Sequence, residues 1–413
     1  MEKIDSIWLY LEPYTFISED SEYYFLYNAR EGKGKSYRKG KMVVPIVNEL
    51  KKVDNLYSTK INIKQLVDKD LFDFINIVQL SGFGDIIEGN IDKPVIFAPV
   101  LSLQRSVERL KEHKASISEN VLIYLHEVVI YLNGSCLYNC KNCLKGFKQQ
   151  VSCTKNEKIL DFESLTKFLF SISYTGASVT LVGGDIFRYE KIDELLLILD
   201  GMNISYTLVS DWRNLPEDSI LEKLSHFERI RLKLLIHQLD NVSAIESLDR
   251  KIGDLNIQKS WHIFVCSEEE LGKAESFSSL FGHSEEVFVK PIYDGTNKSF
   301  FEEYVYIDQE ELDGIELTRQ NIFVLQVLNT NDFGKIVIMP DGKVYANLND
   351  APLGNIGDPI KLLMTKELES KNSWRRTRYD LEPCSQCRFK LICPSISNYE
   401  RVMNKNNLCH IRP

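Results

Sequence analysis

Strand and helix patterns alternate six times along residues 120–292, and this alternation restricts the possible folds more than any other feature. Each repeat opens with a short apolar run and continues with apolar residues at helical spacing. The six runs lie at residues 128–132, 179–182, 204–209, 231–236, 261–265 and 287–289. Strands joined through helices form a parallel sheet, either barrel-like or doubly wound. Six repeats predict an α/β fold and favour a partial (β/α)6 TIM-like barrel over a closed eight-fold one.

The segments on either side of this alternation have different patterns and predict two more domains. In residues 1–115, aromatic strand candidates at 8–14 and 23–28 precede helical segments and a final apolar run, which suggests a winged-helix-like α+β module. In residues 293–413, apolar runs flank Pro340-Asp341-Gly342, which predicts a hairpin turn. The end of this third domain is rich in cysteine and poor in periodicity, so bound metal would supply stability that a thin core there cannot.

Composition and charge narrow the functional classes. The net charge of −9 argues against a nucleic-acid partner, because such binding depends on neutralising phosphates. No apolar run reaches the roughly 18 residues of a membrane span, and residues 1–5 do not resemble a signal peptide. We therefore expect a cytoplasmic protein with no membrane partner. The basic run at residues 375–378 predicts a solvated patch with carboxylate neighbours, and a role in balancing the charge of a thiolate-ligated cluster is the less favoured alternative.

Three cysteines follow the first strand of the alternation as C-x3-C-x2-C, at Cys136, Cys140 and Cys143. Three thiolates hold three irons of a four-iron cluster and leave the fourth iron open to a substrate or cofactor. Zinc with one distant ligand is the structural alternative. The position favours chemistry, because folds of this kind gather their active groups where parallel strands end.

The second strand of the alternation runs into Gly183-Gly184-Asp185. Two glycines allow a sharp exit from the strand and let the backbone approach a ligand closely. At two later strand ends, Asp211 and His237 are polar, but polar residues are common there, so the sequence predicts no general acid or base.

Four further cysteines, Cys384, Cys387, Cys393 and Cys409, form a second group. Four thiolates occupy every position of a site, so this group predicts electron transfer or a structural role rather than substrate binding. Tetrahedral zinc is an equally good explanation from the residues alone. The remaining cysteines, Cys153 and Cys266, are expected to be ordinary buried residues or free thiols. In a reducing compartment, clustered cysteines indicate metal or redox chemistry rather than disulfides.

The three-cysteine loop after strand one, with a Gly-Gly-acid segment after strand two, resembles the radical S-adenosylmethionine (SAM) superfamily. This resemblance implies that Cys136, Cys140 and Cys143 hold a SAM-binding [4Fe-4S] cluster. It also implies that Gly183, Gly184 and Asp185 lie at the methionine part of SAM.

The C-terminal cysteine spacing resembles the SPASM extension of radical SAM peptide maturases, as do the segments at 341–345 and 354–356. The resemblance implies one auxiliary [4Fe-4S] cluster on Cys384, Cys387, Cys393 and Cys409. Such extensions usually hold two clusters, but Ala346-Asn347 and Ser397 stand where further cysteine ligands are expected. The inner auxiliary cluster is therefore expected to be missing.

The core motifs also depart from the common pattern. Asn142 replaces an aromatic residue, Asp185 replaces Glu, and the strand ends at Asp211 and His237 lack the usual sequences. These changes resemble a divergent branch, the pseudo-radical-SAM SPASM proteins, which accompany a second radical SAM maturase in systems for ribosomally made peptide natural products (RiPPs). The implied function is a peptide maturase that acts through a 5′-deoxyadenosyl radical. The alternative is a catalytically degenerate partner that keeps its clusters for structure or electron relay.

The resemblance also implies partners. In many maturases a winged-helix element binds the leader of a precursor peptide by adding a strand to a sheet edge. The N-terminal module is expected to bind the precursor leader in this way, and a companion radical SAM maturase is the second expected partner. Tyr23, Tyr24 and Tyr27 are candidates to line a peptide groove, although ordinary core packing is the favoured explanation for them.

Overall fold

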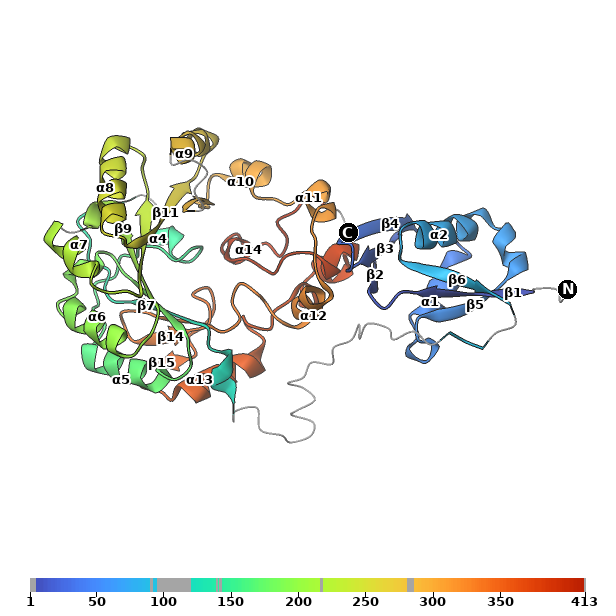
Figure 1. Ribbon diagram of the computed structural model, residues 1–413, viewed down its shortest axis with the longest axis horizontal. Coiled ribbons are helices and arrows are strands. Elements are labelled where there is room, and N and C mark those ends of the chain that lie inside the picture. The colour runs from blue at the N-terminus through green and yellow to red at the C-terminus, as the bar shows by residue number, and fades with distance from the viewer. Residues whose placement is uncertain are drawn as a thin grey trace.

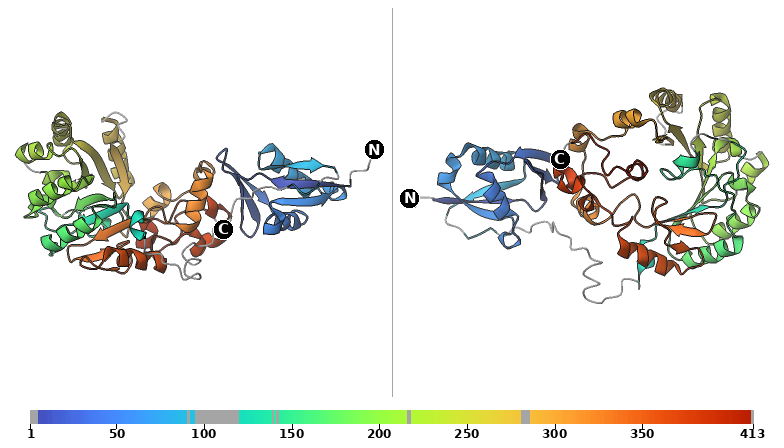
Figure 2. Two further views of the ribbon diagram at one scale, coloured as in Figure 1. Left: turned by 60° about the horizontal axis from the view of Figure 1, so that its bottom comes forward. Right: turned by 180° about the vertical axis from the view of Figure 1, so that it is seen from behind.

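The structure is a computed structural model that describes residues 5–89, 92–94, 120–138, 140, 143–215, 218–280 and 286–411. Its described strands form one large sheet of nine strands and two smaller sheets of three strands. Figure 1 shows the large sheet with its helices at one end of an elongated molecule and the N-terminal module at the other. The orange and red segments at residues 309–327 and 398–402 lie between them, whereas those at residues 335–370 lie with the large sheet (Figures 1 and 2).

Six parallel strands of the large sheet follow one another in chain order. They are β7 (Glu127–Tyr131), β8 (Ser178–Val182), β9 (Tyr206–Asp211), β10 (Ile230–Ile236), β11 (Gln258–Val265) and β12 (Val287–Pro291). A doubly wound sheet reverses its strand order at a switch point, and the six strands from β7 to β12 show no such reversal. The predicted α/β class, with a largely parallel sheet, is confirmed.

Five helices connect these strands and cover the outer face of the curved sheet (Figure 1). They are α5 (Phe162–Ile172), α6 (Ile192–Gly201), α7 (Asp218–Leu224), α8 (Val242–Asp254) and α9 (Glu268–Leu280). α5 shows why such segments are helical. Its Asp161 side chain accepts a hydrogen bond from the Ser164 backbone N–H at 2.8 Å, which caps the first turn. Its buried residues are spaced at three and four positions, so they form one apolar face: Leu165, Phe168, Leu169 and Ile172.

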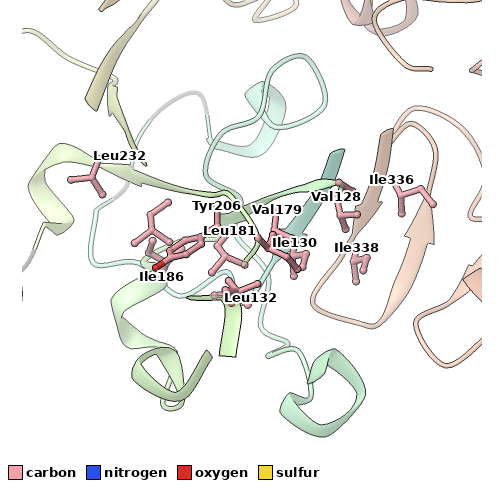
Figure 3. Close-up of a cluster of buried hydrophobic side chains, with 14 of the residues drawn as sticks. Val128, Ile130, Leu132, Val179, Leu181, Ile186, Tyr206, Leu232, Ile336 and Ile338 are labelled. Carbon is pink, nitrogen blue, oxygen red and sulfur yellow. The ribbon is translucent and has the colours of Figure 1, made fainter. Parts of the chain in front are cut away.

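The main core lies between the sheet and these helices. Figure 3 shows that neighbouring strands contribute side chains to one continuous cluster, among them Val128, Ile130, Val179, Leu181, Ile336 and Ile338. Alternate residues of each strand face the opposite, concave side. There they form a smaller cluster that includes Val129, Tyr131, Val209, Leu235 and Phe264 and reaches the cysteine loop.

Three strands from the C-terminal domain extend the large sheet beyond β7. They are β13 (Lys335–Ile338), β14 (Lys343–Tyr345) and β15 (Gly354–Asn355). β13 runs parallel to β7, and β14 returns antiparallel to β13, so the hairpin predicted at Pro340-Asp341-Gly342 is confirmed. Gly342 has φ +80°, a conformation that glycine adopts without steric cost. Outside the N-terminal module, the other described α-helices are α4 (Cys143–Gly146), α10 (Lys298–Tyr304), α11 (Gln309–Asp313), α12 (Arg319–Val327), α13 (Ile360–Ser370) and α14 (Asn398–Val402).

The N-terminal module contains two small sheets. The outer sheet has the order β5-β1-β6 and packs with two helices, α1 (Val43–Leu50) and α2 (Lys69–Leu80). Its strands are β1 (Ser6–Leu11), β5 (Ser58–Asn62) and β6 (Gly84–Glu88), and the inner sheet consists of β2 (Thr15–Glu19), β3 (Tyr23–Asn28) and β4 (Lys33–Arg38). Tyr24 and Tyr27 are each 1% exposed, so they belong to the core, in agreement with the favoured explanation of ordinary core packing.

The inner sheet packs directly on the cysteine-rich C-terminal segment. Phe25 and Phe389 have ring centroids 5.0 Å apart, within a buried cluster that also contains Phe16, Leu312 and Ile392. This packing ties the N-terminal module to the rest of the molecule. None of the described helices has the length and apolar character needed to cross a membrane.

Candidate metal centres

The cysteine loop and the Gly-Gly-Asp segment leave adjacent strands and are hydrogen-bonded to each other. The backbone N–H of Gly184 donates to the Asn133 carbonyl at 3.1 Å, and that of Asp185 donates to the Ser135 carbonyl at 2.6 Å. The Asn133 amide donates to the Asp185 carbonyl at 2.9 Å. A Cβ added to Gly183 or Gly184 would lie under 3.0 Å from backbone oxygen of the cysteine loop. In the described structure, the two glycines therefore make room for the loop that carries the cysteines.

Asp185 uses its side chain within the protein. Its carboxylate accepts a hydrogen bond from the Phe187 backbone N–H at 3.1 Å, which caps a short helical turn, and it lies 3.4 Å from the Arg188 guanidinium. Burial raises the pKa of Asp185 above its ordinary value. The backbone of this segment, rather than the carboxylate, is bonded to the cysteine loop.

Three residues at the end of β9 surround the thiols. Arg213 donates a hydrogen bond to the Cys140 sulfur at 2.9 Å and pairs with Asp211 at 2.7 Å. The Asn214 amide donates to the Cys136 sulfur at 3.5 Å. The sequence argument missed Arg213 and Asn214, and it took Asp211 for a common polar cap. The one sign of Arg213 and Asn214 in the sequence was their position directly after a strand of the same sheet, where folds of this kind gather their active groups.

These contacts favour a thiolate at one position of the loop. A hydrogen bond from the Cys143 thiol lowers the pKa of Cys140 to about 7; burial opposes this shift, and Arg213 supports it. The same hydrogen bond, between the Cys140 and Cys143 side chains, raises the pKa of Cys143. Since thiolates are the form that binds metal, the loop is prepared for soft metal ions.

His237 faces the same thiols from the end of β10. One ring nitrogen and the sulfurs of Cys140 and Cys143 all lie within 4.8 Å of one another. Neither ring nitrogen has a hydrogen-bond partner in the described structure, and the ring packs on Phe264 with centroids 4.9 Å apart. Burial lowers the pKa of His237 to about 4, so the imidazole is neutral near pH 7.

The four C-terminal cysteines line one pocket. Apolar side chains complete it, including Ile307, Leu312, Phe389, Leu408 and Ile411, so Cys384, Cys387, Cys393 and Cys409 are brought together as the sequence predicted. Burial raises the pKa of Cys384 and Cys387 and raises that of Cys393 to about 12. Thiolates in such a pocket need a positive group, such as a metal, beside them.

The spacing of these sulfurs bears on which metal fits. A single tetrahedral zinc with bonds of about 2.3 Å holds its sulfurs roughly 3.8 Å apart. No three of the four sulfurs, all within the described part of the chain, lie within 4.8 Å of one another. As they lie in this structure, the four thiols do not have the close mutual spacing of sulfurs around one zinc ion.

The basic run at residues 375–378 is not a solvated patch, so that prediction is wrong. Arg375 and Arg378 are only 6% and 7% exposed. Arg378 pairs with the buried carboxylate of Glu400, donates to the Pro394 carbonyl at 2.8 Å and approaches the Cys384 sulfur at 3.8 Å. Burial of this guanidinium is possible because a carboxylate and the cysteine pocket offset its charge. The less favoured alternative, a cation beside the cysteine cluster, describes Arg378 correctly.

Asn347, at one of the positions where the sequence resemblance led us to expect a further cysteine, belongs to a hydrogen-bond network. The Asn347 amide donates to Asp332 at 2.9 Å and to Asn398 at 2.6 Å. Arg401 pairs with the same Asp332 at 3.2 Å. Side-chain hydrogen bonds thus connect the segments around Asn347 and α14. Asn142, which replaces an aromatic residue of the common pattern, lies outside the described residues.

Comparison with solved structures identifies the fold. SuiB from Streptococcus suis, in a structure with bound S-adenosylmethionine, matches with a TM-score of 0.50 and 14% identity over 98% of this chain and 99% of that one. A second SuiB structure matches with a TM-score of 0.50 at 13% identity, over 97% of this chain and 100% of that one. A structure of anSMEcpe with AdoMet and a peptide covers 67% of this chain and 94% of that one, with a TM-score of 0.45 and 16% identity. No protein-family model and no curated protein matches the sequence. The chain thus shares the fold of SuiB along nearly its whole length, in agreement with the resemblance seen in the sequence.

Proposed function

We propose that this chain is a radical SAM enzyme that modifies a ribosomally made precursor peptide. One observation carries the proposal. The three-cysteine loop and the Gly-Gly-Asp segment are joined by hydrogen bonds at the ends of adjacent parallel strands, in a fold shared with a SAM-bound protein. This arrangement places three thiols at the edge of the sheet where the chemistry of such folds is found.

In this proposal Cys136, Cys140 and Cys143 hold a [4Fe-4S] cluster, and the segment 183–185 lies beside the methionine part of SAM. When bound and reduced, the cluster supplies an electron that cleaves SAM to a 5′-deoxyadenosyl radical. Arg213 and Asn214 donate hydrogen bonds to the sulfurs and so stabilise the thiolate form. The concave face of the sheet excludes water from the site through its apolar residues, among them Val209, Leu235 and Phe264.

The C-terminal pocket holds one auxiliary [4Fe-4S] cluster in the same proposal. Its wide sulfur spacing and four thiols support a cluster over a single zinc ion. A cluster with a protein ligand on every iron carries electrons or stabilises structure. Arg378 lies beside it and offsets part of its negative charge.

The proposed peptide partner binds the N-terminal module. β4 pairs with β3 on one side, and within the described residues its other edge has no strand partner. Strand addition requires such an edge. Its exposed side chains are Lys33, Lys35 and Arg38, which favour an acidic peptide segment. None of the nine cysteines, all among the described residues, forms a disulfide, which suits a reducing cytoplasm.

The test is anaerobic reconstitution with iron and sulfide, followed by incubation with SAM and a reductant. We expect 5′-deoxyadenosine, and no product from the variant with Cys136, Cys140 and Cys143 changed to Ala. SAM should also change the electron paramagnetic resonance (EPR) signal of the three-cysteine cluster and leave that of the four-cysteine cluster unaltered. A fully loaded protein that yields no 5′-deoxyadenosine contradicts the enzymatic proposal.

That result would support the second candidate, a partner of the precursor peptide or of a companion radical SAM maturase. One observation favours it. The Asp185 carboxylate is already occupied by the Phe187 backbone N–H and by Arg188, so it is less available to a cofactor amine. Asp185→Glu separates the two candidates further, because the longer side chain would reach past this cap and raise SAM cleavage in an enzyme.

A further inference from the structure

The concave face of the large sheet carries three lysines that the proposed chemistry does not use. On each strand, the residues beside these lysines belong to the main core or pack against it, so alternation directs the lysines to the concave side. They are Lys335 on β13, Lys233 on β10 and Lys290 on β12. The chain has 59 acidic and 50 basic residues, so its composition does not explain a gathering of cations in one place.

The carboxylate that acts on Lys233 comes from Glu127 on β7, and it already has partners. One of its oxygens pairs with Lys335 at 3.0 Å, and the other accepts a hydrogen bond from the Thr180 hydroxyl at 3.2 Å. Glu127 thus offsets the charge of Lys335. The charges of the other two lysines are left without a carboxylate of their own.

The ammonium group of Lys233 has no ion pair or hydrogen bond within the part of the chain that the structure describes. Its side chain is partly buried. Burial and the charges of Lys335 and Lys290 lower the pKa of Lys233 to about 8, although Glu127 opposes this shift. A desolvated ammonium group close to other cations is unfavourable, and an anion bound beside it offsets that cost.

β11 lies between the strands that carry Lys233 and Lys290, and it presents polar but uncharged groups on the same face. His262 contacts the Ser260 hydroxyl at 3.2 Å and stacks on Phe288 with ring centroids 4.9 Å apart. Burial, with the charges of Lys233 and Lys290, lowers the pKa of His262 to about 3, so its imidazole is neutral near pH 7. The surroundings of the two lysines therefore add hydrogen-bonding groups without a competing negative charge.

We propose that Lys233 and Lys290 form a binding site for a carboxylate of the precursor peptide. The proposal rests on the proposed function, because it takes a peptide as the substrate. Such a peptide offers carboxylates on Asp and Glu side chains and at its C-terminus, and ammonium groups bind them through charge-assisted hydrogen bonds. Lys233 lies four residues before His237, which faces the thiols, so strand geometry puts the two positions roughly 13 Å apart. An extended peptide held at Lys233 then brings a residue about four positions away to the cysteine loop.

The experiment is competitive labelling of the reconstituted protein with trace acetic anhydride, in which mass spectrometry measures the acetylation of each lysine. The probe is the α-amide of N-acetylglutamate, which has one side-chain carboxylate, and chloride at equal ionic strength is the reference. A bound carboxylate keeps an ammonium group protonated, so acetylation of Lys233 and Lys290 should fall about fivefold or more at saturation. Acetylation of Lys361, exposed on α13, should not change. The α-amide of N-acetylglutamine, which is uncharged, should protect neither lysine.

N-acetylglycine distinguishes the two sources of the carboxylate. Stronger protection by this probe would assign the site to the C-terminus of the peptide, whereas stronger protection by the glutamate probe would assign it to an acidic side chain. Equal acetylation of Lys233 with and without either carboxylate would overturn the proposal. Equal protection by the glutamine probe would overturn it as well, because charge would then play no part.

Lys233→Gln tests whether the two lysines act together. The concentration of the glutamate probe that half-protects Lys290 should rise about tenfold in this variant. Lys233→Arg keeps the charge and should restore most of the protection. Lys361→Gln is the matched control and should leave the protection of Lys290 unchanged. An unchanged half-protecting concentration in Lys233→Gln would remove Lys233 from the site.

These outcomes are separate from those of the proposed function, because protection needs neither SAM nor a reductant. Protection without formation of 5′-deoxyadenosine would keep the carboxylate site and remove the enzymatic proposal. Formation of 5′-deoxyadenosine without protection would leave the enzyme standing and remove the site.

Discussion

The two cysteine sites of this protein are built in opposite ways. The three-cysteine loop lies among polar groups that come from the ends of separate strands, including Asp211, Arg213, Asn214 and His237. The four C-terminal cysteines lie in a mainly apolar pocket, where Arg378 and Lys390 are the nearby cations. The first site offers hydrogen-bond donors and one unpartnered imidazole, whereas the second encloses its thiols.

These two kinds of surroundings suit two different tasks of iron–sulfur sites. A site with adjustable polar neighbours accommodates a ligand that comes and goes, because each state finds hydrogen-bond partners. A site with four thiols in an apolar pocket disfavours ligand exchange and suits a fixed charge carrier. The same pocket also joins the N-terminal module to the body through Phe25 and Phe389. Its integrity should therefore matter for the arrangement of the domains as well as for redox chemistry.

The largest expected effect is on iron content. Two four-iron clusters give about eight irons per chain, and changing Cys136, Cys140 and Cys143 to Ala should reduce this to about four. Iron and sulfide analysis measures the loss. Cys153→Ala, which removes a buried thiol beside the same loop, should keep all eight. Stoichiometric zinc without iron would exclude a cluster at the C-terminal pocket.

The reciprocal change is made at the other site. Cys409→Ala should also leave about four irons, now only at the three-cysteine loop, because the pocket loses one of its four ligands. Metal binding contributes to the stability of the tail, so residues 380–411 should become more sensitive to protease. The three-cysteine loop lies against a separate buried cluster, so it should keep its iron. Unchanged iron content and digestion would show that Cys409 is a free thiol.

Much of this organisation could be predicted because it is encoded locally. Apolar runs and helical spacing predicted the six parallel strands, and the Pro340-Asp341-Gly342 turn predicted a hairpin. The grouping of the four C-terminal cysteines was predicted too, since three of them lie within ten residues. In each case the residues that allow the prediction lie within a short segment of the sequence.

The missed features depend on contacts between distant segments. Arg378 looks like part of an exposed basic run, and only its contacts with Glu400 and Cys384 show that it is buried. His237 looks like a polar strand end until the fold brings it to the thiols. Nor did the sequence show that the loop from Asn133 to Ser135 packs against the glycines at 183 and 184, whose predicted place beside a ligand stays a prediction. No local pattern contains this information.

A third prediction concerns the buried ion pair beside the C-terminal pocket. Arg378→Leu leaves Glu400 buried without its cation, which should lower the free energy of unfolding by about 3 kcal/mol or more. The double variant Arg378→Leu/Glu400→Leu should recover part of this loss, because neither charge remains. Denaturant unfolding of the loaded protein measures both. Arg376→Leu, in the same run but partly exposed, should cost under about 0.5 kcal/mol. Equal losses in the two arginine variants would contradict a special role for the pair.

The smallest expected effect is at the junction of the N-terminal module and the pocket. Asp20 pairs with Arg388 at 2.5 Å and accepts backbone hydrogen bonds from Glu22 and Tyr23. Burial raises the pKa of Asp20, but the hydrogen bond from Arg388 and the backbone bonds outweigh it and lower the pKa overall. Because the folded pKa lies below the unfolded value of about 3.9, the contribution of Asp20 to stability is present above that pH. It is lost as the pH falls through the folded pKa.

Asp20→Asn should therefore weaken this junction by roughly 1–3 kcal/mol at pH 7 and remove the part of its acid sensitivity that Asp20 causes. Hydrogen exchange in residues 15–38 and 387–392 reports the docking of the module. After correction for the intrinsic exchange rate, protection in the unmodified protein should fall below about pH 4, whereas the variant should already be less protected at pH 7 and change less on acidification. Glu49→Gln, which breaks an exposed pair with Lys52 in the same module, should leave the exchange of both segments unchanged. Identical pH profiles for Asp20→Asn and the unmodified protein would show that Phe25, Phe389 and their apolar neighbours hold the module in place without help from the ion pair.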